Sequence, residues 1–97
     1  MLINCTEEEK WEMIGYVMAS NNRYQTLKTI NTKYLMPKQI AEISELKPEQ
    51  ISKSLKALKD KNLVVCKNEK IRKGRIYQTT RLGLEILEMI DNIIEEE

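Results

Sequence analysis

Apolar residues recur at helical spacing over most of the chain. In the first third, Trp11, Ile14 and Val17 lie three residues apart and fall on one helical face. Thr6 precedes this stretch and is followed three positions later by a glutamate, which is the sequence pattern of a capped helix start. A second helical stripe covers residues 23–31. The pattern therefore predicts two helices in this part of the chain.

Two short helices are predicted next, and each begins at a proline, a residue favoured in the first helical turn. The first is PKQIAEI, beginning at Pro37, and its spacing would turn Ile40, Ala41 and Ile43 inward. The second is PEQISKSLKALKDKN, beginning at Pro48.

The second of these helices has two distinct faces. With about 100° per residue, Ile51, Leu55 and Leu58 fall in one narrow stripe. The opposite face carries charged residues, namely Glu49, Lys53, Lys56 and Asp60. A helix, a short connection at 44–47 and a second helix form the layout of a helix-turn-helix, whose second helix enters the major groove of DNA.

After the second of these helices the period changes from helical to β-type. LVVC at 63–66 and IYQT at 76–79 are short β-type runs. A polar loop containing Gly74 joins them, so that the two runs predict a hairpin. A final helix is expected over about 80–95, with Thr80 as its N-cap.

Charge is distributed unevenly, although the formal net charge is only +1. Residues 36–79 carry eleven cations and five anions, whereas residues 80–97 carry one cation and six anions. Five cations stand within nine residues of the predicted hairpin loop, namely Lys67, Lys70, Arg72, Lys73 and Arg75. A basic segment of this kind is the usual electrostatic footprint of a polyanionic partner, and a solvated lysine-rich face is the alternative.

The composition argues against an enzyme and against a metal or cofactor site. Histidine is absent, which removes the commonest general base and the commonest transition-metal ligand. The three glycines stand alone, so that they form no phosphate-binding loop. Cys5 and Cys66 match no metal spacing, which indicates reduced thiols in a cytoplasmic protein. No apolar run reaches the ~18 residues that a membrane span needs.

Nearly the whole chain resembles the winged-helix transcriptional regulators related to the MarR and ArsR groups, especially the compact archaeal type. The resemblance rests on SNNRYQTLKTI, PKQIAEISELKPEQISKSLKALKDKNLV and KGRIYQTTRLGLEIL. It implies a single domain over residues 1–97 that is mainly α with a small β-hairpin wing. The helix-turn-helix would span about 37–61, the wing about 63–79 and a C-terminal dimerisation helix about 80–95.

Two features depart from the family pattern. Met36 and Lys47 stand where the family usually has small hydroxyl N-caps. Because a lost cap costs on the order of 1 kcal/mol, proline and packing would have to hold these helix starts. The paired-cysteine metal box of metal-sensing ArsR proteins is also absent, so that metal sensing by that route is excluded.

The resemblance implies a sequence-specific transcriptional regulator, a repressor, that binds double-stranded DNA. Base edges would be read by the exposed face of the helix at 48–61, chiefly through Gln50, Lys53 and Ser54, with Glu49 and Lys56 nearby. Glutamine can pair bidentately with adenine, and lysine can pair with guanine. Contacts to the phosphate backbone or an adjacent minor groove would come from Lys38, Lys47, Lys70, Arg72, Lys73 and Arg75. Winged helices also serve as protein-interaction modules of larger assemblies, and this is the alternative.

The first and last predicted helices have apolar arcs wider than the roughly 100° stripe that packing on one small domain needs. On the helical wheel of the last helix, the apolar residues fill an arc that has Met89 at one edge and Leu87 at the other. These widths predict a two-fold homodimer built from the terminal helices. The expected interface residues are Trp11, Ile14, Leu87, Ile90 and Ile94. Such a dimer would place two reading helices about one duplex turn (~34 Å) apart. No sequence feature identifies an operator or a small-molecule effector.

Overall fold

The computed structural model describes residues 6–96, so that Cys5 lies outside the described residues. It contains five helices and one two-stranded antiparallel sheet. In chain order the elements are α1 (Glu7–Met18), α2 (Asn21–Ile30), α3 (Pro37–Ser44), α4 (Pro48–Asp60), β1 (Val64–Cys66), β2 (Tyr77–Thr79) and α5 (Arg81–Glu96). The predicted mainly helical fold with a β-hairpin is confirmed.

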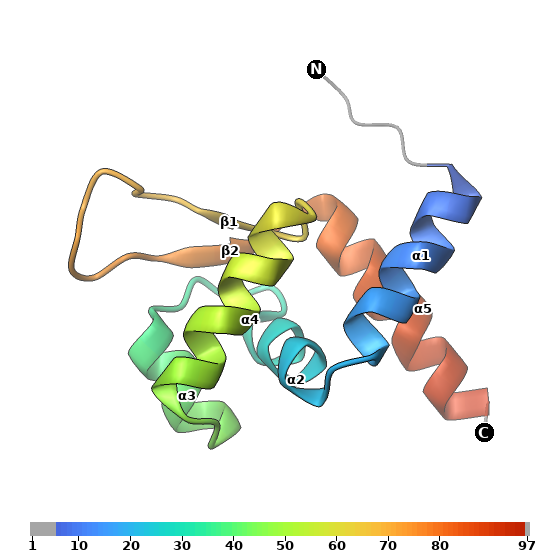
Figure 1. Cartoon of the computed structure of the whole chain (residues 1–97), viewed down its shortest axis with the longest axis horizontal. Helices are drawn as coiled ribbons and strands as arrows, with labels where there is room; N and C mark the ends of the chain where they lie inside the picture. Colours follow the sequence, from blue (N-terminus) through green and yellow to red (C-terminus); the bar gives the residue numbers. More distant parts are fainter. Residues whose placement is uncertain (1–5, 97) are drawn as a thin grey trace.

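Helix α2 occupies the centre of the molecule and contacts every other helix and β2. Helices α3 and α4 and the hairpin lie on one side of it, while α1 and α5 pack together on the other side (Figure 1). The molecule is flat, with extents of 37 × 34 × 19 Å. Because the hairpin loop points away from α1 and α5 (Figure 1), the acidic C-terminal part of α5 is held away from the cations of this loop.

The two N-terminal helices begin at side-chain caps. Thr6 accepts a hydrogen bond from the backbone N–H of Glu9, whose carboxylate accepts in return from Thr6, as the sequence predicts. Helix α2 begins at Asn21, two residues before the predicted start, because the Ser20 hydroxyl accepts a hydrogen bond from the N–H of Arg23. The apparent break in the apolar pattern at this point is therefore the cap and first turn of the next helix.

The core lies where α2, α3, α4 and α5 meet. Its fully buried side chains include Leu27, Ile30, Ile40, Ile51, Leu58, Leu63, Ile86 and Ile90. Ile43 is an exception to the predicted pattern, because its side chain is 55% exposed. Ile40 alone among the described residues of α3 is buried, so that this short helix reaches the core through one large side chain.

The hairpin pairs Val64 with Thr79 and Cys66 with Tyr77. On the other side of β2 the sheet is extended by a single residue, Leu35. The N–H of Leu35 donates to the carbonyl oxygen of Tyr77 at 3.1 Å, and the N–H of Tyr77 donates to the carbonyl oxygen of Leu35 at 2.8 Å. This bridge ties the segment between α2 and α3 to the hairpin. Nothing in the sequence indicates it, because a single bridging residue has no periodicity.

Helix α5 begins in close contact with the hairpin. Thr80 caps it as predicted, because its hydroxyl accepts a hydrogen bond from the N–H of Gly83 at 3.0 Å. The same hydroxyl donates to the carbonyl oxygen of Asn62 at 2.6 Å. At Gly83 the helix approaches the residue before β1 so closely that an added Cβ would lie 2.1 Å from the carbonyl oxygen of Leu63. Only glycine allows this approach.

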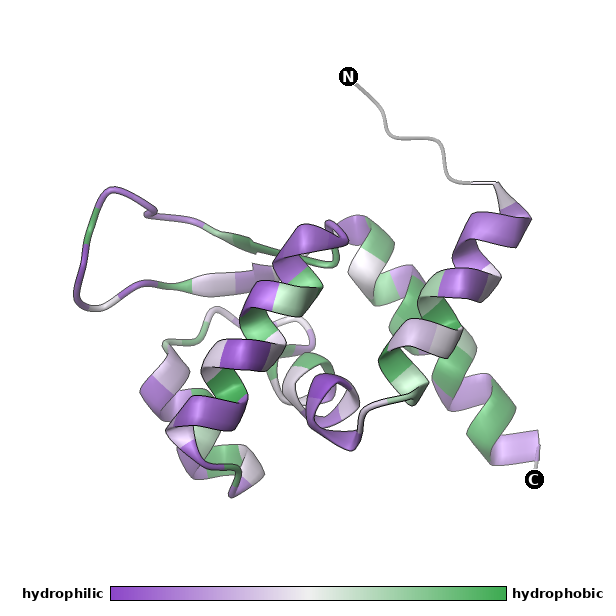
Figure 2. Ribbon diagram, viewed as in Figure 1, coloured by the Kyte–Doolittle hydropathy of each residue, from purple (hydrophilic) through white to green (hydrophobic). Residues whose placement is uncertain are grey.

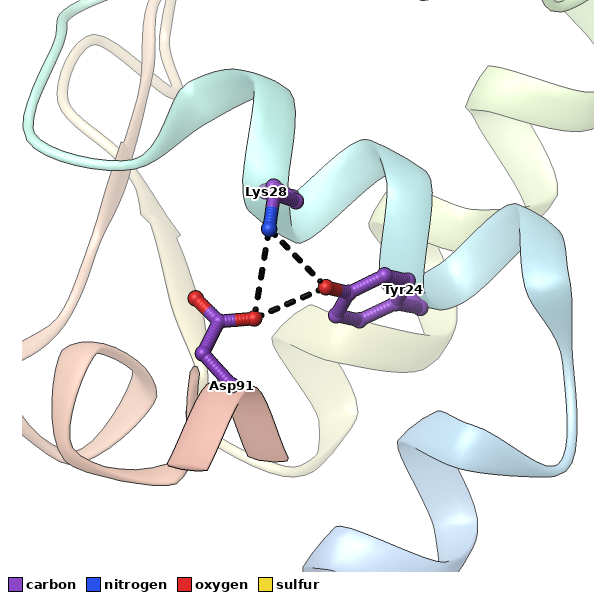
Figure 3. Close-up of polar contacts among 3 residues, drawn as sticks. All are labelled: Tyr24, Lys28 and Asp91. Atoms are coloured by element: carbon purple, nitrogen blue, oxygen red, sulfur yellow. Dashed lines mark hydrogen bonds and ion pairs between the residues drawn. The ribbon is translucent and has the colours of Figure 1, made fainter. Parts of the chain in front are cut away.

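A polar cluster joins α2 to α5 (Figure 3). The hydroxyl of Tyr24 donates to Asp91 Oδ1 at 2.8 Å, and Lys28 Nζ donates to both groups at 3.0 and 3.3 Å. The hydrogen bonds from its ammonium group to Tyr24 and Asp91 raise the pKa of Lys28. The cluster fixes the central helix relative to the C-terminal helix.

The wide apolar arc of α5 is filled largely within one chain. Figure 2 shows apolar positions along the α5 face that meets α1, and α5 also contacts α2 and β2. Ile14, Leu87 and Ile90 are at most 4% exposed, so that the prediction of these three as interface side chains is wrong. Trp11 and Ile94 remain exposed, at 57% and 44%. Among the described helices, none is both long and apolar enough to cross a bilayer.

Candidate nucleic-acid interface

Helices α3 and α4 start in the same way. Gln39 Oε1 accepts a hydrogen bond from the N–H of Met36 at 2.8 Å, and Gln50 Oε1 accepts from the N–H of Lys47 at 2.9 Å. In both helices the glutamine stands two positions after the first-turn proline, and the side chain at the N-cap position forms no capping hydrogen bond. The glutamines therefore replace the missing hydroxyl caps. The repeated Pro-x-Gln pattern was the sequence signal for this arrangement.

This cap changes what Gln50 can do. Bidentate pairing with adenine needs one donor and one acceptor from the same amide. The amide oxygen of Gln50 already accepts from the N–H of Lys47, so that the predicted bidentate pairing has to use the second lone pair of this oxygen or break the cap. The amide nitrogen of this half-buried side chain remains a donor for a single contact.

The outward face of α4 carries the predicted charged residues. Glu49, Lys53 and Lys56 are all exposed there. Ser54, in contrast, is only 4% exposed, so that its prediction as a base-reading residue is wrong. Ser54 lies roughly 60° from Ile51 on the helical wheel, at the edge of the buried face of α4.

Ser52 is the exposed serine of this helix, and the sequence interpretation missed it. It lies roughly 100° from Ile51, outside the buried stripe, which was the signal that could have found it. The predicted backbone-contact residues Lys38 and Lys47 are exposed at the starts of α3 and α4. The first turns of the two helices thus bring an exposed hydroxyl close to several cations.

The hairpin loop extends away from the body as a hydrophilic arm (Figure 2). Its predicted contact residues are all exposed, namely Lys70, Arg72, Lys73 and Arg75. Arg75 has a second role, because its Nε donates to the carbonyl oxygen of Ile71 at 2.8 Å and so braces the loop. Gly74 has a φ of 76°, the left-handed conformation that glycine adopts without strain.

Asn68 closes the base of the loop. Its amide oxygen accepts from the N–H of Ile76 at 2.8 Å, and its amide nitrogen donates to the carbonyl oxygen of Gly74 at 3.1 Å. The next residue, Glu69, forms an ion pair with Lys59 of α4. This pair lowers the pKa of Glu69 and raises that of Lys59, since each charge favours the other. The loop is therefore attached to α4 as well as to its own strands.

We expect Asn68→Ala to loosen the hairpin loop without changing its charge. Removing one partner of the bond to Ile76 should speed hydrogen exchange of that amide by about fivefold or more, which corresponds to roughly 1 kcal/mol. Exchange of the Leu63 amide, which bonds to the carbonyl oxygen of Leu58, serves as the control and should not change. Equal protection of Ile76 in both proteins would show that Asn68 does not brace the loop.

The basic groups thus come together on one side of the molecule. The exposed cations Lys38, Lys53, Lys56 and those of the hairpin loop belong to α3, α4 and the hairpin, which lie on the side of α2 opposite α1 and α5 (Figure 1). Within residues 6–96, no group of three or more His, Cys, Asp or Glu side chains is placed to hold a metal ion. Cys66 is a buried free thiol in β1. The chemistry that this surface offers is electrostatic attraction and hydrogen bonding to an anionic partner.

Comparisons with solved structures reveal the same architecture in DNA-associated proteins. TubR of Bacillus thuringiensis, bound to 24 bp of tubC, matches with a TM-score of 0.76 at 15% identity over 95% of this chain and 99% of TubR. A MarR-family protein from Porphyromonas gingivalis matches with a TM-score of 0.71 at 22% identity, over 97% of this chain and 94% of that one. The homodimeric winged helix-turn-helix domain of Mb0332 from Mycobacterium bovis matches with a TM-score of 0.70 at 17% identity, over 98% of this chain and 92% of that one.

No protein-family model and no curated protein matches the sequence. The structural likeness is nevertheless close over almost the whole chain, and it extends from the helix-turn-helix to the hairpin and the terminal helices. The chain therefore has the winged helix-turn-helix fold of MarR- and ArsR-type transcriptional regulators, with α3 and α4 as the helix-turn-helix and the β1–β2 hairpin as the wing.

Proposed function

We propose that the protein is a regulator of transcription that binds double-stranded DNA in a sequence-specific way. The observation that carries this proposal is the exposed cationic face of α4 beside the basic wing, both on the same side of a winged helix-turn-helix. Two structural neighbours are described in complex with DNA, namely TubR and MepR of Staphylococcus aureus. The action as a repressor, which the resemblance implies, stays a prediction.

In this proposal the two basic elements have different tasks. Helix α4 enters the major groove, where Lys53 donates to guanine and Glu49 accepts from cytosine. Lys38 and Lys47 at the helix starts bind phosphates, as do the exposed cations of the wing. The phosphate contacts position the protein and supply most of the affinity, whereas the few base contacts select the sequence.

The assignment of Lys53 leads to a direct prediction. Lys53→Ala should weaken binding to the preferred duplex by about 1–3 kcal/mol, with a much smaller loss on scrambled DNA. Lys38→Ala is the matched control, because a phosphate contact should be lost equally on both duplexes. Selection from a random duplex pool supplies the preferred site, and titration of both duplexes measures the losses. An equal loss for Lys53→Ala on both would make this residue a backbone contact.

We further propose that the protein is a two-fold dimer through α1 and α5. Three large apolar side chains stay exposed on these helices, namely Trp11, Met18 and Ile94, at 57%, 45% and 44%. Met18 and Ile94 line one surface hollow of about 140 Å³, which places these two exposed side chains close together. Mb0332 is described as homodimeric. Burial of this apolar surface against a second copy would remove it from water.

The dimer can be tested with charges at its proposed centre. Trp11→Asp combined with Ile94→Asp should reduce the solution mass from two chains to one at micromolar concentration, because buried unpaired carboxylates are costly. Ile43→Asp serves as the control, since it places a carboxylate on an exposed apolar position of α3. Light scattering measures the masses. A wild-type protein that is monomeric at high micromolar concentration would contradict the dimer.

A further inference from the structure

A surface hollow lies between the two helices of the helix-turn-helix. It has a volume of about 450 Å³ and is lined by Pro37, Lys38, Ala41, Glu42, Pro48 and Ser52. Most of its surface is apolar, and its lining combines two prolines and an alanine with two charged residues and a serine. Such a lining suits a small apolar group that is attached to a polar partner.

The position of the hollow restricts what can fill it. Pro48 and Ser52 lie on the first turns of α4, which the proposed function places in the major groove. Lys38 and Glu42 line the hollow with opposite charges, and Lys47 directly precedes its lining residue Pro48 in the chain. The hollow is thus continuous with the surface that would meet DNA, where the exposed Lys38 and Lys47 can bind phosphates beside it.

Only one base offers an apolar group in the major groove. Thymine projects its C5-methyl group there, whereas the other three bases present hydrogen-bond donors and acceptors. Alanine and other small apolar side chains are the usual contacts of this methyl group. The apolar walls at Ala41 and Pro48 therefore match thymine better than they match any other base edge.

We propose that the hollow between α3 and α4 is a specificity site that receives the C5-methyl edge of a thymine. This inference rests on the proposed function as a DNA-binding regulator and names the base that this part of the surface selects. Ala41 and Pro48 contact the methyl group, Ser52 sets how much room is left beside it, and Lys38 binds the adjoining phosphate. Ser52 is a positioning residue in this arrangement, since its size controls access to the hollow.

The test removes single methyl groups from the DNA. In the preferred duplex each thymine is replaced in turn by deoxyuridine, which keeps base pairing and loses only the methyl group. In each half-site we expect one thymine whose methyl group is buried, and its replacement should lower the wild-type affinity about fourfold. Replacing the symmetry-related pair should cost about fifteenfold, since the two effects multiply. Scrambled duplexes with the same replacements should show no change.

Two substitutions at one position assign the effect to the hollow. Ser52→Ala leaves it open and should keep the preference for thymine over deoxyuridine. Ser52→Leu projects a larger apolar side chain into the hollow and should reduce the preference, with Ser52→Val giving a smaller reduction. A preference that is unchanged in both variants would overturn the assignment, because the methyl group would then bind elsewhere.

The outcomes separate this inference from the proposed function. Wild-type protein that selects a duplex but is indifferent to every thymine methyl group overturns the hollow as a thymine site, and the proposed function stands. Wild-type protein that binds no duplex at all overturns the proposed function and this inference together.

Discussion

Neutralising the tip of the wing should reduce DNA affinity by about two to three orders of magnitude for each bound subunit at ~0.1 M salt, since each phosphate contact contributes a slope of about −0.9 in log affinity against log salt. The variant is Lys70→Ala, Arg72→Ala and Lys73→Ala in one chain. All three side chains are exposed. Arg75 is left unchanged, because it also braces the loop through Ile71, and its loss would mix a structural effect with an electrostatic one.

The control for this variant keeps the charge and changes the side chains. Lys70→Arg, Arg72→Lys and Lys73→Arg together should preserve both the affinity and its salt dependence, because phosphate contacts depend mainly on charge. The alanine variant should lose affinity equally on preferred and scrambled duplexes, with a slope flatter by about 2.7 for each bound subunit. If the slope of the alanine variant equals that of the wild type, the wing does not touch DNA.

Gly83→Ala should destabilise the fold by about 2–3 kcal/mol, because a methyl group forced into a packed contact causes strain. The added carbon would lie 2.1 Å from the carbonyl oxygen of Leu63 and 2.6 Å from the side chain of Thr79. The carbonyl cannot withdraw without cost, since it accepts the hydrogen bond from the N–H of Thr80 at 3.0 Å. We expect a fall in the melting temperature of about 10–20 °C.

Asn92→Ala is the matched control for Gly83→Ala. It also introduces alanine into α5, but at an exposed position, and should stabilise slightly through helix propensity, by about 0.5 kcal/mol. Urea unfolding of both variants at one protein concentration measures the difference. A Gly83→Ala protein as stable as the wild type would mean that α5 moves away from β1 at no cost.

The sequence predicted most of the elements because their signals are local. The helix starts at Thr6 and Thr80, the two proline-led helices and the hairpin strands all follow from residues within a few positions of one another. The bridge between Leu35 and Tyr77 could not be predicted, since it joins residues far apart in the chain through their backbones. The approach of Gly83 to Leu63 is of the same kind.

The candidate site was predicted less completely, for two physical reasons. A polar residue beside the apolar stripe can be buried in the folded chain, as Ser54 is, while Ser52 on the other flank is exposed. A side chain suited to reading bases can be engaged by its own helix, as Gln50 is by the N–H of Lys47. Both outcomes depend on packing and on rotamers, which residue type alone does not determine.

The width of an apolar arc was an unsafe basis for the dimer. Helix α5 is apolar over a wide arc because it packs against α1 on one side and against α2 and β2 on another. Three of the five predicted interface residues are therefore core residues. The apolar area that stays exposed in one chain is a better indicator of an interface. By this measure the proposed interface consists of Trp11, Met18 and Ile94.

The most direct test of the central claim is the affinity of the full chain for its selected duplex and for a scrambled duplex of the same composition, measured over a series of salt concentrations. The selected duplex should bind at least about 10³-fold more tightly than the scrambled one at physiological salt. Both affinities should fall steeply as salt increases, because both depend on phosphate contacts. Equal affinity for the two duplexes, or no binding to either at low salt, would contradict a sequence-specific DNA-binding regulator.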